Sequence, residues 1–311
     1  MRRVEPLINL ALLLPRRPRE FRDRVAGYAD LGLERLWRSS PAYETARWQG
    51  VLRDIEEHLG RVTEILDEPA LKEVEDDTRR LLEDIRARDP FSPRWAADSR
   101  FARLGYVLCR LISPSVVLET GVAYGVSSVF ILKALEVNGR GTLHSVDLPP
   151  LRSEYERFWG IAVPEALKVR WRLHRGSSAR VLPWLLREIR TIDLFVHDSL
   201  HTRGNMRREF ETVWPHLRNG AILMADDVER NRAFSELRQK SPALWRVIQD
   251  REESPLHGRA APVVFGIAIK WHFSTAPAGH LVSTLRAYGS RLSASQLLLL
   301  RHSLPRTRIQ C

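Results

Sequence analysis

Four ionisable residues have types and positions that could do chemistry. Asp198 ends one apolar run and is followed by His201, while Asp226 and Asp227 end the next apolar run of the chain. If the three carboxylates converge, they repel one another unless a cation joins them, and an all-oxygen set suits Mg²⁺, Mn²⁺ or Ca²⁺. A histidine in the same loop can take a proton from a substrate hydroxyl. The pattern therefore indicates proton removal from an oxygen beside a divalent metal.

A second candidate site is the turn "ETGVAYG", which follows the apolar run 116–118 and precedes a helix-like stretch. Gly121 and Gly125 would let the backbone approach a ligand closely, and Glu119 would place a carboxylate beside the free N–H groups of the helix. The spacing is G-x-x-x-G without the lysine of a phosphate loop, and it differs from the G-x-G-x-x-G of dinucleotide folds. A carboxylate at this position suits a cationic ligand better than a pyrophosphate.

The elements that must position these residues alternate from residue 99 onward. Short β-type runs separated by helix-length segments predict a mostly parallel sheet covered by helices on both faces, with the glycine turn at the carboxyl end of its first strand. The last two runs have only a polar loop between them, which predicts an antiparallel hairpin at one edge of the sheet. The expected strands are Val116–Glu119, Thr142–Val146, Val169–Leu173, Ile192–Val196, Ala221–Met224, Leu244–Ile248 and Val263–Lys270.

The sequence divides into three regions. Residues 1–98 place apolar residues at helical intervals among many charges, which predicts an all-helical N-terminal region acting as a cap or an association surface. Residues 99–272 form the predicted α/β domain, and residues 273–311 form a tail that we expect to be partly helical.

The glycine turn resembles the first motif of the class I S-adenosylmethionine-dependent methyltransferases, and four further stretches follow in that family's order: "LHSVDLPP", "RGSSARVLPWL", "TIDLFVHDSLHT" and "LRNGAILMADD". The resemblance implies a Rossmann-like sheet over roughly residues 100–272, and S-adenosylmethionine as cofactor. Asp147 matches the acid that holds the ribose hydroxyls, and Ser177 stands where the family contacts adenine. The implied cofactor-binding residues are Glu119, Thr120, Gly121, Ala123, Gly125, Ser127, Asp147, Ser177 and Asp198.

The acidic constellation is similar to that of metal-dependent O-methyltransferases that act on sugars and on macrolide or aminocoumarin sugar units. In that family the fourth and fifth strands are neighbours, so the resemblance implies that the acids meet at one rim of the pocket. It implies Asp198 and His201 as catalytic residues, with His201 the general base, and Mg²⁺ or Mn²⁺ as the metal. The implied metal ligands are Asp198, Asp226 and Asp227, and Glu209 matches a further acidic position. The sequence departs from this family at Ser199, Arg203 and Ala221, which affects the shape of the loop more than its chemistry.

Composition restricts the partners. A formal net charge of +11 favours anionic partners, but the arginines form no long basic run with interleaved aromatics, so dedicated nucleic-acid binding is not expected. Cys109 and Cys311 form no disulfide framework, and the apolar stretch 7–14 is too short to span a membrane. We expect a cytoplasmic enzyme with a small-molecule or sugar acceptor, for which peripheral contact with an anionic surface and a homo-oligomeric state are both open.

Three other functions stay open at this level. The glycines and acids taken singly are also common turn residues and helix caps, so a metal-independent methyltransferase is compatible with the sequence. The positive charge is compatible with a nucleic-acid-directed methyltransferase, although the loop after residue 197 lacks that group's Pro-Pro-Tyr motif. A non-catalytic S-adenosylmethionine-binding scaffold that acts through its helical half is the third alternative.

Overall fold

The computed structural model describes residues 5–36, 41–86, 97–250 and 263–270. Eight strands in this part of the chain form one sheet in the order β1-β7-β8-β6-β5-β2-β3-β4. Their bounds are β1 Thr45–Ala46, β2 Val116–Thr120, β3 Thr142–Asp147, β4 Trp171–Arg175, β5 Ile192–His197, β6 Leu217–Asp226, β7 Leu244–Asp250 and β8 Val263–Ile269. Strands β4, β3, β2, β5 and β6 are parallel neighbours, and β8 is antiparallel to both β6 and β7. The predicted Rossmann-like sheet with an antiparallel hairpin is confirmed.

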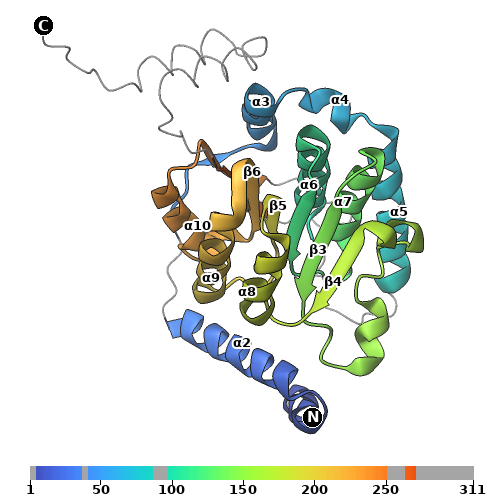
Figure 1. Cartoon of the computed structure of the whole chain (residues 1–311), viewed down its shortest axis with the longest axis vertical. Coiled ribbons are helices and arrows are strands. Elements are labelled where there is room, and N and C mark those ends of the chain that lie inside the picture. Colours follow the sequence, from blue (N-terminus) through green and yellow to red (C-terminus); the bar gives the residue numbers. More distant parts are fainter. Residues whose placement is uncertain (1–4, 37–40, 87–96, 251–262, 271–311) are drawn as a thin grey trace, which may run out of the picture. The chain divides into compact units, whose positions relative to one another are not determined.

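Helices cover both faces of this sheet (Figure 1). Neighbouring strand residues point to opposite faces, so Val117 packs with α3, α5, α6 and α7, whereas Leu118 packs with α8, α9 and α10. The helices are α1 Glu5–Arg16, α2 Pro18–Leu36, α3 Trp48–Leu59, α4 Val62–Leu66, α5 Pro69–Arg86, α6 Ser99–Ile112, α7 Val126–Val137, α8 Ser178–Ile189, α9 Arg203–Val213 and α10 Ala233–Glu236. The 3-10 turns include η2 Ser153–Phe158 and η3 Glu165–Arg170.

The N-terminal region differs from the all-helical expectation at β1. Thr45 and Ala46 pair in parallel with Val247 and Ile248, so β1, and not the hairpin, forms this edge of the sheet. A strand of two residues is too short to show the alternation by which strands are recognised in a sequence. The buried side chains of α3 and α5 belong to the same cluster as those of α6 and α7, so residues before 98 contribute directly to the core of the α/β domain. The tail 273–311 lies outside the described residues.

Two strands are displaced from their predicted positions. The residues before Trp171 form η3, so β4 runs from 171 to 175 instead of from 169 to 173. β6 begins at Leu217, four residues earlier than expected, and crosses the polar pair Arg218 and Asn219. β4 and β6 end at Arg175 and Asp226, each two residues later than predicted, and the candidate residues still lie at the carboxyl edge of the parallel strands. Open α/β sheets bind their ligands at this edge.

Candidate functional site at the carboxyl edge of the sheet

The glycine turn after β2 is shaped by the neighbouring backbone. Gly121 has a φ of +88°, and a Cβ atom added there would lie 1.9 Å from the carbonyl oxygen of Asp198. Gly125 has a φ of +83°, and its added Cβ would lie 3.1 Å from Cα of Gly160. The backbone conformation disfavours an L side chain at both positions, and at Gly121 the space excludes it as well. In the structure, these glycines therefore let the turn lie close to the loops that follow β5 and η2.

Glu119 lies inside the fold and not at the mouth of the site, contrary to the sequence expectation. Its side chain is fully buried and accepts hydrogen bonds from Ser127 and Ser128 at 2.6 Å each and from Ser145 at 2.7 Å. Burial raises the pKa of Glu119, and the three serine hydroxyls oppose that change. Glu119 thus joins the start of α7 to β3. Ser127, which the resemblance assigned to the cofactor, is one of its partners.

Asp147 ends β3 and holds the glycine turn. Its Oδ2 atom accepts hydrogen bonds from the backbone N–H groups of Val122 and Ala123 at 3.1 and 3.2 Å and from the indole N–H of Trp159 at 2.9 Å. Burial raises the pKa of the Asp147 carboxyl, and these donors oppose it. Ala123 adopts a φ of +46°, which is uncommon for a residue other than glycine. Strained backbone of this kind concentrates at ligand sites. Here the strained residue, Ala123, is bonded to Asp147, the last residue of β3.

The acids after β5 and β6 converge, as the sequence indicated, but the set that could hold a cation differs from the predicted one. Asp198, His201 and Asp226 each offer one ligand atom, and these atoms lie within 4.8 Å of one another. Burial raises the pKa of Asp198 well above its usual range, and the charges of Asp227 and Glu119 add to this effect. Burial and the charge of Asp198 likewise raise the pKa of Asp226. Asp198 and Asp226 are partly buried, and a bound cation would stabilise their charged forms.

Asp227 stands beside this group instead of in it. Its Oδ2 atom lies 2.7 Å from Nη2 of Arg230 and 3.2 Å from Nδ1 of His201. Asp226 is the last residue of β6, and Asp227 begins the following turn with a φ of +53°. The change from extended to left-handed backbone separates two side chains that are adjacent in sequence, which the sequence alone did not indicate.

The environment of His201 favours the neutral form of its imidazole. Burial lowers its pKa well below the usual value, and the nearby His197 and Arg230 lower it further. Its Nε2 atom is buried without a hydrogen-bond partner and lies 3.7 Å from Oδ1 of Asp198. With Nδ1 beside Asp227, the imidazole has one nitrogen oriented by a carboxylate and the other open toward the acid cluster.

Sequence reasoning named Glu209 as a further acidic position but missed His197 and the buried pair that the two residues form. Both side chains are fully buried, and Nδ1 of His197 lies 2.7 Å from Oε2 of Glu209. Glu209 also accepts hydrogen bonds from Thr120 at 2.6 Å, Ser199 at 2.8 Å and Asn205 at 2.9 Å. Burial alone would raise the pKa of Glu209, but His197 and the hydrogen bonds lower it to about 2. The available signal was a histidine at the end of the mostly apolar strand β5. Thr120, which the resemblance assigned to the cofactor, instead donates a hydrogen bond to Glu209.

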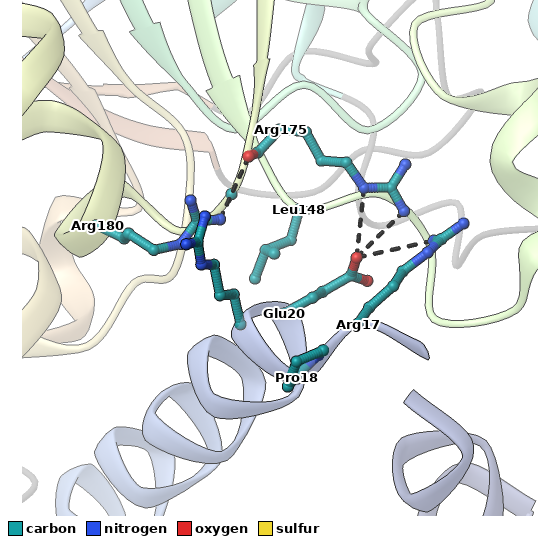
Figure 2. Close-up of a pocket in the computed structure, with 8 residues that line it drawn as sticks. Arg17, Pro18, Glu20, Leu148, Arg175 and Arg180 are labelled. Atoms are coloured by element: carbon teal, nitrogen blue, oxygen red, sulfur yellow. Dashed lines mark hydrogen bonds and ion pairs between the residues drawn. The ribbon is translucent and has the colours of Figure 1, made fainter. Parts of the chain in front are cut away.

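Ser177 is the N-cap residue of α8, and its side chain makes no capping hydrogen bond. Its backbone N–H donates instead to Oδ2 of Asp23, on α2, at 3.2 Å. A cavity of about 370 Å³ lies here, between the first turn of α2 and the ends of β3 and β4 (Figure 2). The expected adenine position therefore has a wall from the N-terminal region, which the sequence did not indicate.

Comparison with known proteins found a family match and similar solved structures. Residues 118–228 match a family described as a methyltransferase domain. The O-methyltransferase TomG from Streptomyces achromogenes, involved in tomaymycin synthesis and solved with S-adenosylmethionine, is 20% identical, with 74% of this chain and 100% of that chain covered and a TM-score of 0.49. An O-methyltransferase from Bacillus cereus, solved with S-adenosylhomocysteine, is 16% identical, with 71% and 97% covered and a TM-score of 0.46. The search of curated proteins found no match.

No helix among the described residues combines the length and the apolar character that crossing a membrane requires.

Proposed function

Because residues 118–228 match a family described as a methyltransferase domain, we propose that this chain transfers a methyl group from S-adenosylmethionine to a hydroxyl of a small molecule or sugar, with a divalent metal at the acid cluster. The observation that carries the proposal is the meeting of Asp198, His201 and Asp226 at the same edge of the sheet as the glycine turn. A methyl donor held at the turn and a hydroxyl held at the acids would lie at adjacent strand ends.

The residues of the cluster fit a divalent cation. Two carboxylates are ligands that Mg²⁺ and Mn²⁺ both accept, while an imidazole ligand suits Mn²⁺ better than Mg²⁺, and the Nε2 atom of His201 has no other partner. A ligating histidine commonly donates its other ring N–H to a carboxylate, and Asp227 is in position to receive it at 3.2 Å. We therefore propose Asp198, Asp226 and His201 as ligands, with Asp227 orienting the histidine.

A divalent cation at this position would lower the pKa of an acceptor hydroxyl. The further contribution of the protein is to position the two reactants. The network of Glu209 fixes the loop that carries Asp198 and His201, because it joins this loop to β2 and α9. Holding two reactants in line supplies about 7–11 kcal/mol in well-oriented systems, which exceeds the usual contribution of a general base. The base role of His201 stays the alternative, since the same open Nε2 could accept the hydroxyl proton.

A transfer assay tests this function. The chain would be incubated with S-adenosylmethionine carrying a labelled methyl group and with a panel of sugars and polyhydroxylated small molecules. We expect label in at least one hydroxyl acceptor, its loss after EDTA treatment, and its return with Mg²⁺ or Mn²⁺. Full transfer in EDTA after exhaustive dialysis would leave a metal-independent methyltransferase, and transfer to RNA or DNA alone would replace the proposed acceptor class. A cytoplasmic location and a homo-oligomeric state stay predictions.

A further inference from the structure

The first half of helix α2 faces the rest of the fold with charged side chains. Oε2 of Glu20 lies 3.1 Å from Nη2 of Arg175, the last residue of β4, and the Glu20 side chain is 7% exposed. Oδ2 of Asp23 accepts a hydrogen bond from Nε of Arg180, on α8, at 2.8 Å. Both carboxylates are largely buried, and a buried charge without a partner would be strongly unfavourable. This side of α2 is therefore held against the end of β4 and the start of α8.

The second half of α2 is attached in the same way beside α9 (Figure 1). Oδ2 of Asp30 lies 3.3 Å from Nη2 of Arg208, and Glu34 accepts a hydrogen bond from the backbone N–H of Arg203 at 2.8 Å. Asp30 and Glu34 follow the first two acids at helical intervals, so all four lie on one side of the helix. Because α2 contains no other acid, its negative charge is directed entirely at the rest of the fold.

The opposite side of α2, which we call its outer face, is apolar and exposed. Its large apolar side chains are Val25, Tyr28, Leu33 and Leu36, which are 43%, 50%, 56% and 79% exposed. Ala29 and Gly32 lie between them and are exposed as well. An ordinary surface helix buries its apolar stripe against the core and turns its charged residues to water. Helix α2 has the reverse arrangement, so its outer face needs a partner other than water.

Helix α1, which packs against α2, exposes further apolar side chains. Leu10 and Leu13 are buried, whereas Leu12 and Leu14 are about half exposed. Of the ten large apolar side chains that are exposed in the described part of the chain, seven lie on α1 and α2. Apolar side chains scattered singly over a surface need no explanation, but a concentration of them marks an interaction surface.

The exposed charges of α2 and of the last turn of α1 are all positive. Arg16, Arg19, Arg22 and Arg35 are exposed, and none of them pairs with a carboxylate among the residues whose side chains the structure describes. Arg22 lies on the outer face itself, one helical turn before Val25. The apolar surface is thus accompanied by positive charge alone.

These charges distinguish between possible partners of the outer face. A second copy of the chain would present the same arginines, so a symmetric contact between two outer faces would bring like charges together with no acid to pair them. A bilayer that contains anionic lipid has negative headgroups above an apolar layer, and it complements both the arginines and the apolar side chains. The long stem of arginine lets its charged end stay among the headgroups while neighbouring leucines enter more deeply.

We propose that the outer face of α2, together with Leu12 and Leu14 of α1, docks this protein on the surface of an anionic bilayer. Helix α2 would lie in the plane of the interface, because its other side stays bonded to β4, α8 and α9. This inference goes beyond the proposed function and does not rest on it, since binding to a bilayer requires neither cofactor nor methyl acceptor.

Co-sedimentation of the full chain with lipid vesicles tests the inference. The vesicles consist of phosphatidylcholine alone or of phosphatidylcholine with about one-third phosphatidylglycerol. The wild type should bind the anionic vesicles roughly tenfold or more tightly than the neutral ones, and added salt should reduce this preference because it screens the headgroup charge. Equal binding to both kinds of vesicle, or binding to neither, would overturn the inference.

An apolar double variant places the binding on α2. Val25→Ser with Leu33→Ser should weaken binding to the anionic vesicles by roughly tenfold or more, because apolar surface no longer enters the bilayer. The matched control is Val137→Ser with Val169→Ser, at exposed valines on α7 and η3. The control should bind as the wild type does, and an equal loss in both proteins would contradict docking through α2.

A second double variant tests the charges. Arg22→Gln with Arg35→Gln should weaken binding by roughly tenfold or more, since each arginine near an anionic surface contributes a severalfold gain in affinity. Arg187→Gln with Arg190→Gln removes the same charge from exposed positions at the end of α8 and should have a smaller effect. Equal losses in the two proteins would show attraction by net charge alone and would overturn the assignment to α2.

Sedimentation equilibrium examines the competing partner. All the substituted side chains on α2 are exposed, so urea unfolding should show wild-type stability in both variants. If the apolar variant does not fold, the arginine variant decides the question alone. A wild-type dimer that Val25→Ser with Leu33→Ser dissociates, without binding of the wild type to anionic vesicles, would assign the outer face to a second copy of the chain and overturn the inference.

Discussion

The Nδ1 atom of His201 lies 3.2 Å from Oδ2 of Asp227, while the Nε2 atom of the same ring is buried without a partner near Asp198. This arrangement divides the acids of the site into two groups. Asp198 lies near the open nitrogen and groups with Asp226 and His201, whereas Asp227 lies beside the other nitrogen of the ring. The roles of the acids can therefore be separated by substitution.

Asp227→Asn should weaken Mn²⁺ binding without abolishing it. If the carboxylate only orients His201, its loss should lower metal affinity by about 10- to 100-fold, as for other residues that hold a metal ligand in place. Electron paramagnetic resonance of free Mn²⁺ measures this directly. Asp54→Asn is a suitable control, because Asp54 pairs with Arg246 away from the acid cluster. Complete loss of binding in Asp227→Asn would return this residue to the ligand set that the sequence predicted.

His201→Ala distinguishes the two roles of the histidine. As a ligand, His201 should carry most of the Mn²⁺ affinity, so the variant should lose metal binding while it keeps the affinity for S-adenosylhomocysteine. As a general base, it should leave metal binding intact and lower the transfer rate by about 10²- to 10⁴-fold, with recovery at higher pH. We expect the first result. Metal affinity equal to that of the wild type would exclude the ligand role.

Gly121→Ala should destabilise the fold itself, even when no ligand is bound. The added Cβ would lie 1.9 Å from the carbonyl oxygen of Asp198, and the φ of +88° is unfavourable for alanine. We expect a loss of roughly 2 kcal/mol or more in the free energy of unfolding, measured in urea. Gly50→Ala is the control, because nothing lies within 4 Å of its added Cβ and its φ is negative. A Gly121→Ala protein of wild-type stability would contradict this reading of the turn.

The buried pair of Glu209 and His197 gives a pH-dependent stability. The folded-state pKa of Glu209 is about 2, below its ordinary value in an unfolded chain, so its stabilising contribution is present above about pH 4.3 and is lost as the pH falls toward 2. Glu209→Gln should therefore be less stable than the wild type by about 3 kcal/mol at pH 7, and this difference should shrink between pH 4 and pH 2. Urea unfolding at several pH values measures it. A constant difference would show that the carboxylate is not charged in the fold.

The sequence predicted the α/β sheet and its hairpin, because buried parallel strands produce strong local patterns, whereas the meeting of the acids was implied by the strand order of the family that the sequence resembles. It did not predict β1, because two residues are too few to show a periodic pattern. It did not predict the burial of Glu119 either, because three serines from two elements are needed to form hydrogen bonds with that carboxylate. The position of Asp227 beside His201, outside the group formed by Asp198, His201 and Asp226, depended on the left-handed backbone of Asp227 itself. The contribution of α2 depended on ion pairs between residues more than 150 positions apart, as in Glu20 and Arg175.

Titration of the purified chain with S-adenosylhomocysteine by calorimetry tests the central claim most directly. The wild-type protein should bind one molecule per chain with saturation. Asp147→Asn should weaken this binding by roughly tenfold or more, because the acid at the end of β3 both holds the glycine turn and is assigned to the ribose hydroxyls. Absence of saturable binding in the wild type, or equal affinity in the two proteins, would contradict a methyltransferase site at this edge of the sheet.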